Sequence, residues 1–166
     1  MKIFLIGPMG SGKSKIGKIL SDKLDLNLFD IDKEIERSLG LSINEIFKSK
    51  GEGFFRSIET KFLRKSKILN DSIISTGGGV IEKKENLKLL EDEKNVIFLN
   101  CSVDSQFNNT KGSSKRPLLN TNNPKLVLKN LYEKRIESYK KVSKLELLSD
   151  SMSNEEIANK IIDYLK

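Results

Sequence analysis

Short apolar runs alternate with helically spaced apolar positions along the whole chain. A continuous apolar run of four or five residues predicts a buried strand, and apolar residues that recur every three or four positions predict a helix. We expect strands over residues 2–6, 26–29, 72–75, 96–99 and 145–148. We expect helices over residues 13–24, 31–39, 42–50, 54–66, 84–90, 103–108, 124–141 and 154–165. Residues 110–123 show no apolar period, which favours a loop.

This alternation of strands and helices predicts an α/β fold with three layers, in which a five-stranded parallel sheet lies between helices. Right-handed crossovers bring the carboxyl ends of all parallel strands to one edge of the sheet, and ligands bind at that edge. No internal repeat or long linker divides the chain. We therefore expect residues 1–166 to form a single domain that acts as a monomer.

The residue types narrow the chemistry of the protein. A single cysteine, Cys101, excludes an intrachain disulfide and a cysteine-rich zinc site, and the absence of histidine excludes imidazole catalysis. A bound metal should therefore be a hard ion with oxygen ligands. The apolar runs are too short to cross a bilayer, and the chain begins with a strand pattern, not a signal peptide. We expect a cytoplasmic protein without a membrane partner.

The formal net charge of +7 raises the question of nucleic-acid binding. Most of this charge is lysine, scattered among acidic and amide residues as on a solvated helix surface. Arginine, whose planar fork grips carboxylate or phosphate, occurs at five positions only, and no basic run alternates with aromatic residues. We therefore expect a small-molecule substrate and no nucleic-acid partner.

A phosphate-binding motif occupies residues 7–14, where the chain has the pattern G-x-x-x-x-G-K-S between the first strand and the first helix. Glycine lets the backbone curl so that its N–H groups face an anion, and the helix N-terminus adds a positive dipole end. The expected ATP contacts are Gly10, Ser11, Gly12, Lys13, Ser14 and Lys15. Lys13 should reach the β- and γ-phosphates, and the Ser14 hydroxyl should face Mg²⁺.

Acidic and glycine residues follow the second and third expected strands. The second strand runs into Asp30 and Asp32, whereas the third runs into the glycines 77–79. Because all strand ends share one edge of the sheet, these residues should meet the phosphate-binding loop. We assign Asp30 to the magnesium site and Asp32 to the side of the phosphoryl acceptor.

With these features the chain resembles the shikimate kinases. The matching motifs are D-I-D at 30–32, G-E-G-F-F-R-S-I-E at 51–59, T-G-G-G at 76–79, R-P-L-L at 116–119 and Y-E-K-R-I-E-S-Y at 132–139. The resemblance extends over about residues 2–142 and implies a P-loop kinase fold with a mobile lid at about 110–123. It implies transfer of the γ-phosphoryl group of ATP to the 3-hydroxyl of shikimate, which gives shikimate 3-phosphate for chorismate and aromatic amino acid biosynthesis.

The resemblance also implies roles for individual residues. Arg56 and Arg135 would clamp the shikimate carboxylate through charge-assisted hydrogen bonds. Asp32 would accept from ring hydroxyls, the nucleophile included, while Arg116 in the lid and Lys13 would stabilise the transferring phosphoryl group. The backbone would approach the ring closely at Gly77, Gly78 and Gly79, because glycine has no side chain.

The chain departs from the family pattern at Asn109. Members of the family commonly carry an arginine there, seven residues before R-P-L-L, which packs on adenine. Asparagine cannot stack a guanidinium group on the base. A second departure lies at residues 149–154, where the family often has an Arg/Pro loop on the other face of adenine and this chain has S-D-S-M-S-N. We therefore expect looser recognition of adenine in this chain.

Two other functions are compatible with a phosphate-binding loop alone. A related kinase could phosphorylate a nucleoside monophosphate or gluconate, and a non-catalytic module could only bind nucleotide. Two acceptor-side arginines beside one aspartate suit one carboxylate and several hydroxyls better than an acceptor phosphate. The presence of Lys13, Ser14, Asp32 and Arg116 argues against a non-catalytic module.

Overall fold

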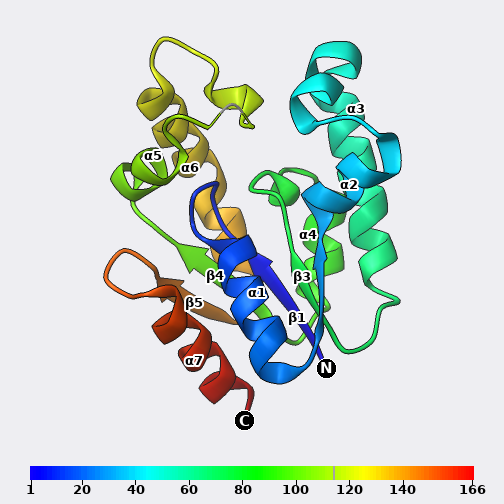
Figure 1. The fold of residues 1–166 in the computed structure, drawn as a ribbon, viewed down its shortest axis with the longest axis vertical. Helices are drawn as coiled ribbons and strands as arrows, with labels where there is room; N and C mark the ends of the chain where they lie inside the picture. The colour runs from blue at the N-terminus through cyan, green and yellow to red at the C-terminus, as the bar shows by residue number, and fades with distance from the viewer. Residues whose placement is uncertain (114) are drawn as a thin grey trace.

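The structure is a computed structural model that describes residues 1–113 and 115–166; Ser114, in the expected lid, lies outside the described residues. Five parallel strands form one sheet in the order β2-β3-β1-β4-β5 (Figure 1). The strands are β1 (Lys2–Ile6), β2 (Asn27–Asp30), β3 (Ser72–Ser75), β4 (Val96–Asn100) and β5 (Leu145–Leu148). The predicted parallel sheet of five strands is confirmed.

Helices cover both faces of the sheet. They are α1 (Lys13–Leu24), α2 (Ile31–Leu39), α3 (Ile43–Ser66), α4 (Lys84–Glu91), α5 (Val103–Thr110), α6 (Pro124–Val142) and α7 (Asn154–Leu165). Two short 3₁₀ turns, η1 (Val80–Glu82) and η2 (Pro117–Leu119), lie before α4 and α6. None of the helices in the described part of the chain is long and apolar enough to span a membrane.

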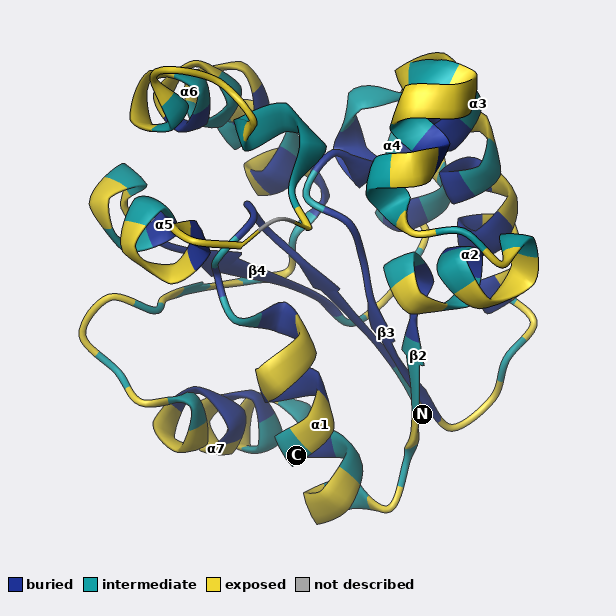
Figure 2. Ribbon diagram, turned by 45° about the horizontal axis from the view of Figure 1, so that its top comes forward, coloured by how far each residue is buried: buried dark blue, intermediate teal, exposed yellow. Residues whose placement is uncertain are grey.

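The core consists of two apolar clusters, one on each face of the sheet. Side chains alternate across a strand, so Ile3 and Leu5 of β1 face α1 and α7, whereas Phe4 and Ile6 face α2, α3, α4 and α6. In Figure 1, α1 and α7 lie together on one side of the sheet, and their contact closes that cluster. Figure 2 shows that β3 and β4 are buried and that exposed residues gather on the outer helix surfaces.

Local geometry explains where the structure and the predicted elements differ. Element α3 covers the two helices predicted over 42–50 and 54–66, and its backbone leaves the helical region at Gly51 with φ 80° and ψ 168°. Glycine tolerates this positive φ, so α3 consists of two helical segments that meet at a kink, as the sequence predicted. The turns η1 and η2 were not predicted, because a single turn is too short to show a helical period.

The parallel register brings three segments to one edge of the sheet. Ser75, at the end of β3, pairs with Leu5 of β1 and with Asp30 of β2. The next residue, Thr76, donates from its backbone N–H to the Leu5 carbonyl at 3.2 Å. The loop after β1, the end of β2 and the glycines after β3 therefore lie side by side, as the sequence predicted.

Helix α3 buries an ion pair at this edge. The Arg56 Nη1 atom donates to Glu59 Oε2 at 3.0 Å, and neither residue is exposed by more than 8%. The pKa of Glu59 is raised to about 7, mainly by burial. The negative charge of Asp32 also raises it, whereas the positive charge of Arg56 lowers it. The other carboxylate oxygen, Oε1, has no hydrogen-bond partner among the described residues.

The raised pKa of Glu59 predicts a pH-dependent stability. Since its ordinary pKa is 4.5, the folded state binds more protons than the unfolded state between about pH 4.5 and pH 7. The free energy of unfolding should therefore fall as the pH rises through this range, by up to about 3 kcal/mol. We expect Glu59→Gln to flatten this slope in urea unfolding experiments, while the exposed control Glu133→Gln keeps it. Equal slopes in wild type and Glu59→Gln would contradict the prediction.

Candidate active site

The loop between β1 and α1 curls around the N-terminus of α1. Gly10 and Gly12 have left-handed φ values of 81° and 88°, a region that suits glycine. Gly12 caps α1 without a side-chain hydrogen bond, so the cap leaves the first N–H groups of the helix without a side-chain acceptor. Unpaired N–H groups and the positive dipole end together make an anion-binding position.

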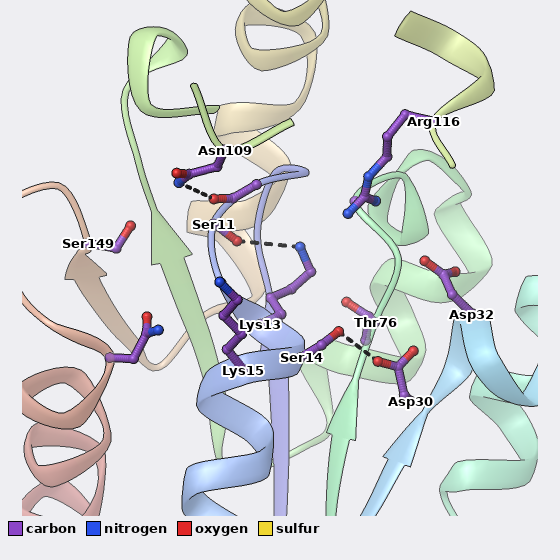
Figure 3. A pocket seen from close by; sticks show the side chains of 14 residues that line it. Ser11, Lys13, Ser14, Lys15, Asp30, Asp32, Thr76, Asn109, Arg116 and Ser149 are labelled. Carbon is purple, nitrogen blue, oxygen red and sulfur yellow. Dashed lines mark hydrogen bonds between the residues drawn. The ribbon is translucent and has the colours of Figure 1, made fainter. Parts of the chain in front are cut away.

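A cavity of about 350 Å³ opens above this loop. Figure 3 shows side chains from the loop, β2, the segment just before η2 and the turn after β5 around it. Its lining residues are Gly10, Ser11, Gly12, Lys13, Ser14, Lys15, Asp30, Asp32, Thr76, Gly78, Asn109, Arg116, Ser149 and Asn154. All six predicted ATP-contact residues of the loop line this one cavity, as does Arg116.

Lys13 folds back over the loop. Its Nζ atom donates to the carbonyl oxygens of Gly7 and Pro8, each at 2.8 Å, and lies 3.4 Å from Ser11 Oγ. The pKa of Lys13 is lowered to about 8, mainly by burial and also by the positive charge of Arg116, while the charge of Asp32 opposes the shift. Among the residues that the structure describes, the hydrogen-bond partners of Lys13 are uncharged, and an anion in the cavity would stabilise its charged form.

Ser14 and Asp30 form an oxygen-rich pair beside the loop. The Ser14 hydroxyl donates to Asp30 Oδ2 at 2.7 Å (Figure 3). Asp30 Oδ1 caps α2 by accepting from the Lys33 N–H at 3.3 Å. Within residues 1–113 and 115–166 no three histidine, cysteine or acidic residues converge on a metal position. One hydroxyl and one carboxylate suit Mg²⁺, which keeps several waters and completes its shell with substrate phosphates.

A second, smaller cavity of about 70 Å³ lies between the glycines after β3, the helices α3 and α6, and the residues around η2. The polar residues and glycines that line it are Asp32, Arg56, Glu59, Gly77, Gly78, Gly79, Lys115, Arg116 and Arg135. Apolar side chains such as Phe47, Phe55 and Leu118 complete the wall. Asp32, Gly78 and Arg116 line both cavities, so the two spaces meet at these residues.

Asp32 stands at this junction, in the first turn of α2. Its Oδ1 atom is buried and has no hydrogen-bond partner among the described residues. Burial raises the pKa of Asp32, and the neighbouring charge of Asp30 adds to this effect, whereas Arg116 and Lys13 oppose it. A buried carboxylate oxygen without a partner can accept a hydrogen bond from a ligand hydroxyl or hold a proton.

Arg56 and Arg135 reach the second cavity from α3 and α6. Arg56 donates to Glu52 Oε1 from Nε at 3.2 Å and from Nη2 at 3.1 Å, in addition to its bond with Glu59. Arg135 donates to Glu82 Oε1 from Nε at 2.8 Å and from Nη2 at 2.6 Å. Each guanidinium is thereby held in a fixed orientation at the cavity wall.

The glycines after β3 are required by close contacts. A Cβ atom on Gly79 would lie 2.3 Å from Arg56 Nη2, and one on Gly77 would lie 2.6 Å from Glu59 Oε1 and 3.0 Å from Asp32 Oδ1. A side chain at either position would therefore displace the charged groups of the cavity. The Tyr139 hydroxyl also donates to the Gly78 carbonyl and fixes this segment from α6.

Several residues of the site were not predicted from the sequence. Glu59 and Glu82 hold the arginines, and Ser149 and Asn154 line the larger cavity. Glu59 follows Arg56 by three positions on the buried face of α3, and this helical spacing could have predicted that the two side chains pair. Nothing in the spacing pointed to Glu82, whereas the resemblance to shikimate kinases had placed residues 149–154 near adenine without a role for Ser149 or Asn154.

Asn109 occupies the end of α5 beside the loop. Its Nδ2 atom donates to the Gly10 carbonyl at 2.9 Å (Figure 3). The side chain thus binds the phosphate-binding loop and lines the larger cavity through its amide. As the sequence indicated, the side chain at position 109 is neutral and cannot stack a cationic group on the base.

Comparisons with known proteins agree with this geometry. A family model described as shikimate kinase matches residues 9–166. A shikimate kinase of Marinomonas sp. (strain MWYL1) is 38% identical over 166 residues, which covers 99% of this chain and 91% of that protein. The enzyme of Histophilus somni (strain 2336) is 40% identical over 164 residues, with 98% and 94% covered.

Solved structures show the same relationship. Shikimate kinase from Acinetobacter baumannii in complex with shikimate superposes with a TM-score of 0.96 at 33% identity, covering 99% of this chain and 92% of that chain. A deoxyadenosine kinase from M. mycoides, with a TM-score of 0.64 at 17% identity, covers 99% of both chains and shares the fold alone. These neighbours confirm the predicted P-loop kinase fold. From the family model and its full-length relatives, we conclude that this chain belongs to the shikimate kinase family.

Proposed function

We propose that this protein transfers the γ-phosphoryl group of ATP to the 3-hydroxyl of shikimate and releases shikimate 3-phosphate and ADP. The observation that carries the proposal is the junction of two cavities at Asp32, Gly78 and Arg116. One cavity has the features of a triphosphate site, and the other offers arginines and a carboxylate to a small hydroxy acid. Their junction would bring an acceptor hydroxyl close to a terminal phosphate.

On the nucleotide side, the backbone N–H groups of the loop would bind the phosphates, and Lys13 would exchange its carbonyl partners for phosphate oxygens. Ser14 and Asp30 would hold Mg²⁺, which when bound neutralises charge on the β- and γ-phosphates. Arg116 lies in the segment 110–123, which we propose closes over the phosphates as a lid. Closure would exclude water and place its guanidinium on the transferring group.

On the acceptor side, Arg56 and Arg135 would bind the shikimate carboxylate, and Asp32 would accept a hydrogen bond from the attacking hydroxyl. The raised pKa of Asp32 suits it to take the hydroxyl proton as the oxygen attacks phosphorus. Glu59 Oε1, which lacks a partner among the described residues, offers a second acceptor for a ring hydroxyl. The glycines 77–79 would let the ring pack against backbone.

The charge balance of the second cavity favours a singly charged acid over a phosphate monoester. Arg56 and Arg135 already pair with Glu52, Glu59 and Glu82, and Asp32 offsets part of the charge of Lys115 and Arg116, so little net positive charge remains for a dianion. This argues against a nucleoside monophosphate as the acceptor. We also propose that the protein is a cytoplasmic monomer, and that it has no nucleic-acid or membrane partner because its positive charge is mostly lysine scattered among acidic and amide residues.

The proposed activity predicts the outcome of an acceptor panel. Purified protein with ATP and Mg²⁺ should consume ATP rapidly with shikimate, and only slowly with gluconate, with AMP or without an acceptor. Chelation of Mg²⁺ by EDTA should abolish the reaction, and excess Mg²⁺ should restore it. Phosphorus NMR of the product should show a phosphate ester on the 3-hydroxyl. Comparable turnover of AMP or gluconate, with shikimate inert, would overturn the assignment.

Because position 109 carries an asparagine and not an arginine that could stack on adenine, we predict loose selectivity for the base. Phosphate contacts do not depend on the base, and a missing cation–π contact weakens binding by roughly 0.5–2 kcal/mol. We expect kcat/KM for GTP to lie within about one to two orders of magnitude of the value for ATP. Asn109→Arg should improve kcat/KM for ATP selectively, whereas Asn108→Arg on the exposed part of α5 serves as the control. Strict ATP selectivity that Asn109→Arg leaves unchanged would show that another part of the cavity recognises adenine.

A further inference from the structure

Glu82 makes a two-donor contact with Arg135 that links two distant parts of the chain. Glu82 ends the turn η1, and Arg135 lies in the middle of α6. Both Nε and Nη2 of Arg135 donate to a single oxygen, Glu82 Oε1, at 2.8 and 2.6 Å. The Arg135 side chain is 3% exposed and that of Glu82 is 19% exposed, so water screens the pair weakly.

The position of Glu82 is fixed by the turn that follows the glycines. The Glu82 N–H donates to the Gly79 carbonyl at 3.0 Å, and the buried Asn86 side chain donates to the Val80 carbonyl at 2.7 Å. The same turn therefore fixes the position of the glycine backbone at the second cavity and of the Glu82 carboxylate that accepts hydrogen bonds from Arg135. Lys134 Nζ lies 3.5 Å from the other carboxylate oxygen, Oε2, on the outer side.

Glu82 grips Arg135 from outside the cavity. Arg135 lines the second cavity, whereas Glu82 is absent from the described residues that line either cavity. Nε and Nη2 lie along one edge of the planar guanidinium, so Glu82 occupies that edge and leaves the Nη1 side out of this contact. Burial opposes the charged form of Glu82, but its hydrogen bond and ion pair with Arg135 outweigh this and lower its pKa.

We propose that Glu82 is a positioning residue of the acceptor site, which fixes the plane of Arg135 so that its Nη1 side faces the carboxylate of the acceptor. This inference rests on the proposed function, because it assigns that carboxylate to shikimate. A long arginine side chain loses considerable rotamer freedom when it binds a ligand, and a preformed contact removes that cost beforehand. Glu82 would thus strengthen acceptor binding without touching the acceptor.

The test compares Glu82→Ala with Glu82→Gln. Alanine removes the acceptor of both hydrogen bonds, whereas glutamine keeps an oxygen that Arg135 can bind. We expect Glu82→Ala to raise KM and the calorimetric Kd for shikimate about 10- to 100-fold, with kcat and the KM for ATP within about twofold. Glu82→Gln should restore KM to within about threefold of the wild-type value.

An uncharged ligand separates positioning from a general structural effect. The methyl ester of shikimate lacks the carboxylate, so its affinity should change less than about twofold between wild type and Glu82→Ala. Glu91→Ala provides a matched control, because it removes the 2.8 Å ion pair with Lys141 between α4 and α6, outside both cavities. Thermal unfolding of each variant shows whether the fold is retained, and Glu82→Gln tests the proposal if Glu82→Ala does not fold.

Three results would overturn the proposal. They are an unchanged or lower KM for shikimate in Glu82→Ala, equal impairment in Glu82→Ala and Glu82→Gln, and an equal loss of affinity for shikimate and its methyl ester. The second result would mean that the negative charge, not the hydrogen-bond geometry, matters. Failure of the wild type to bind or phosphorylate shikimate would instead contradict the proposed function, so the two failures are distinguishable.

Discussion

Charged side chains buried at the carboxyl edge of the sheet are the constraint on which the site depends. Lys13, Arg56 and Arg135 are each 8% exposed or less, and Glu59 is fully buried. A buried charge is costly unless it is paired and hydrogen-bonded. The structure meets this requirement with loop carbonyls for Lys13 and with carboxylates from α3 and η1 for the two arginines. The cations are consequently held in place before any ligand binds.

The same requirement explains why glycine follows β3. Charged groups from α2 and α3 approach the backbone of this segment so closely that a Cβ at Gly77 or Gly79 would collide with them. Helix α6 approaches from the other side, where Tyr139 binds the Gly78 carbonyl. The glycines therefore let three elements converge on one small cavity, and the parallel sheet places that cavity beside the phosphate-binding loop.

Much of this arrangement follows from the sequence. The apolar runs and periods predicted all five strands and the helices, because the central strands are buried on both faces and the helices pack one side on the sheet. The order of strands and helices then placed the loop 7–14, Asp30, Asp32 and the glycines 77–79 at one edge. The cavity linings bring these residues together with Arg56, Arg116 and Arg135, whose catalytic roles stay predictions.

What the sequence could not predict are contacts between side chains far apart in the chain. Glu82 and Arg135 are separated by 53 positions, and neither the helical period nor any motif pairs them. The bonds of Lys13 to loop carbonyls depend on the path of the loop backbone, which motif spacing does not determine.

The central claim is that Asp32 joins the two cavities and acts on the acceptor hydroxyl, and Asp32→Asn tests it most directly. Asparagine preserves the shape of the side chain but cannot accept a proton. The measurement is kcat for shikimate phosphorylation, with calorimetric Kd values for ATP and shikimate, in wild type, Asp32→Asn and the exposed control Asp22→Asn. We expect kcat of Asp32→Asn to fall roughly 10²- to 10⁴-fold while the Kd for ATP changes less than about threefold. Turnover near the wild-type rate in Asp32→Asn would contradict the account.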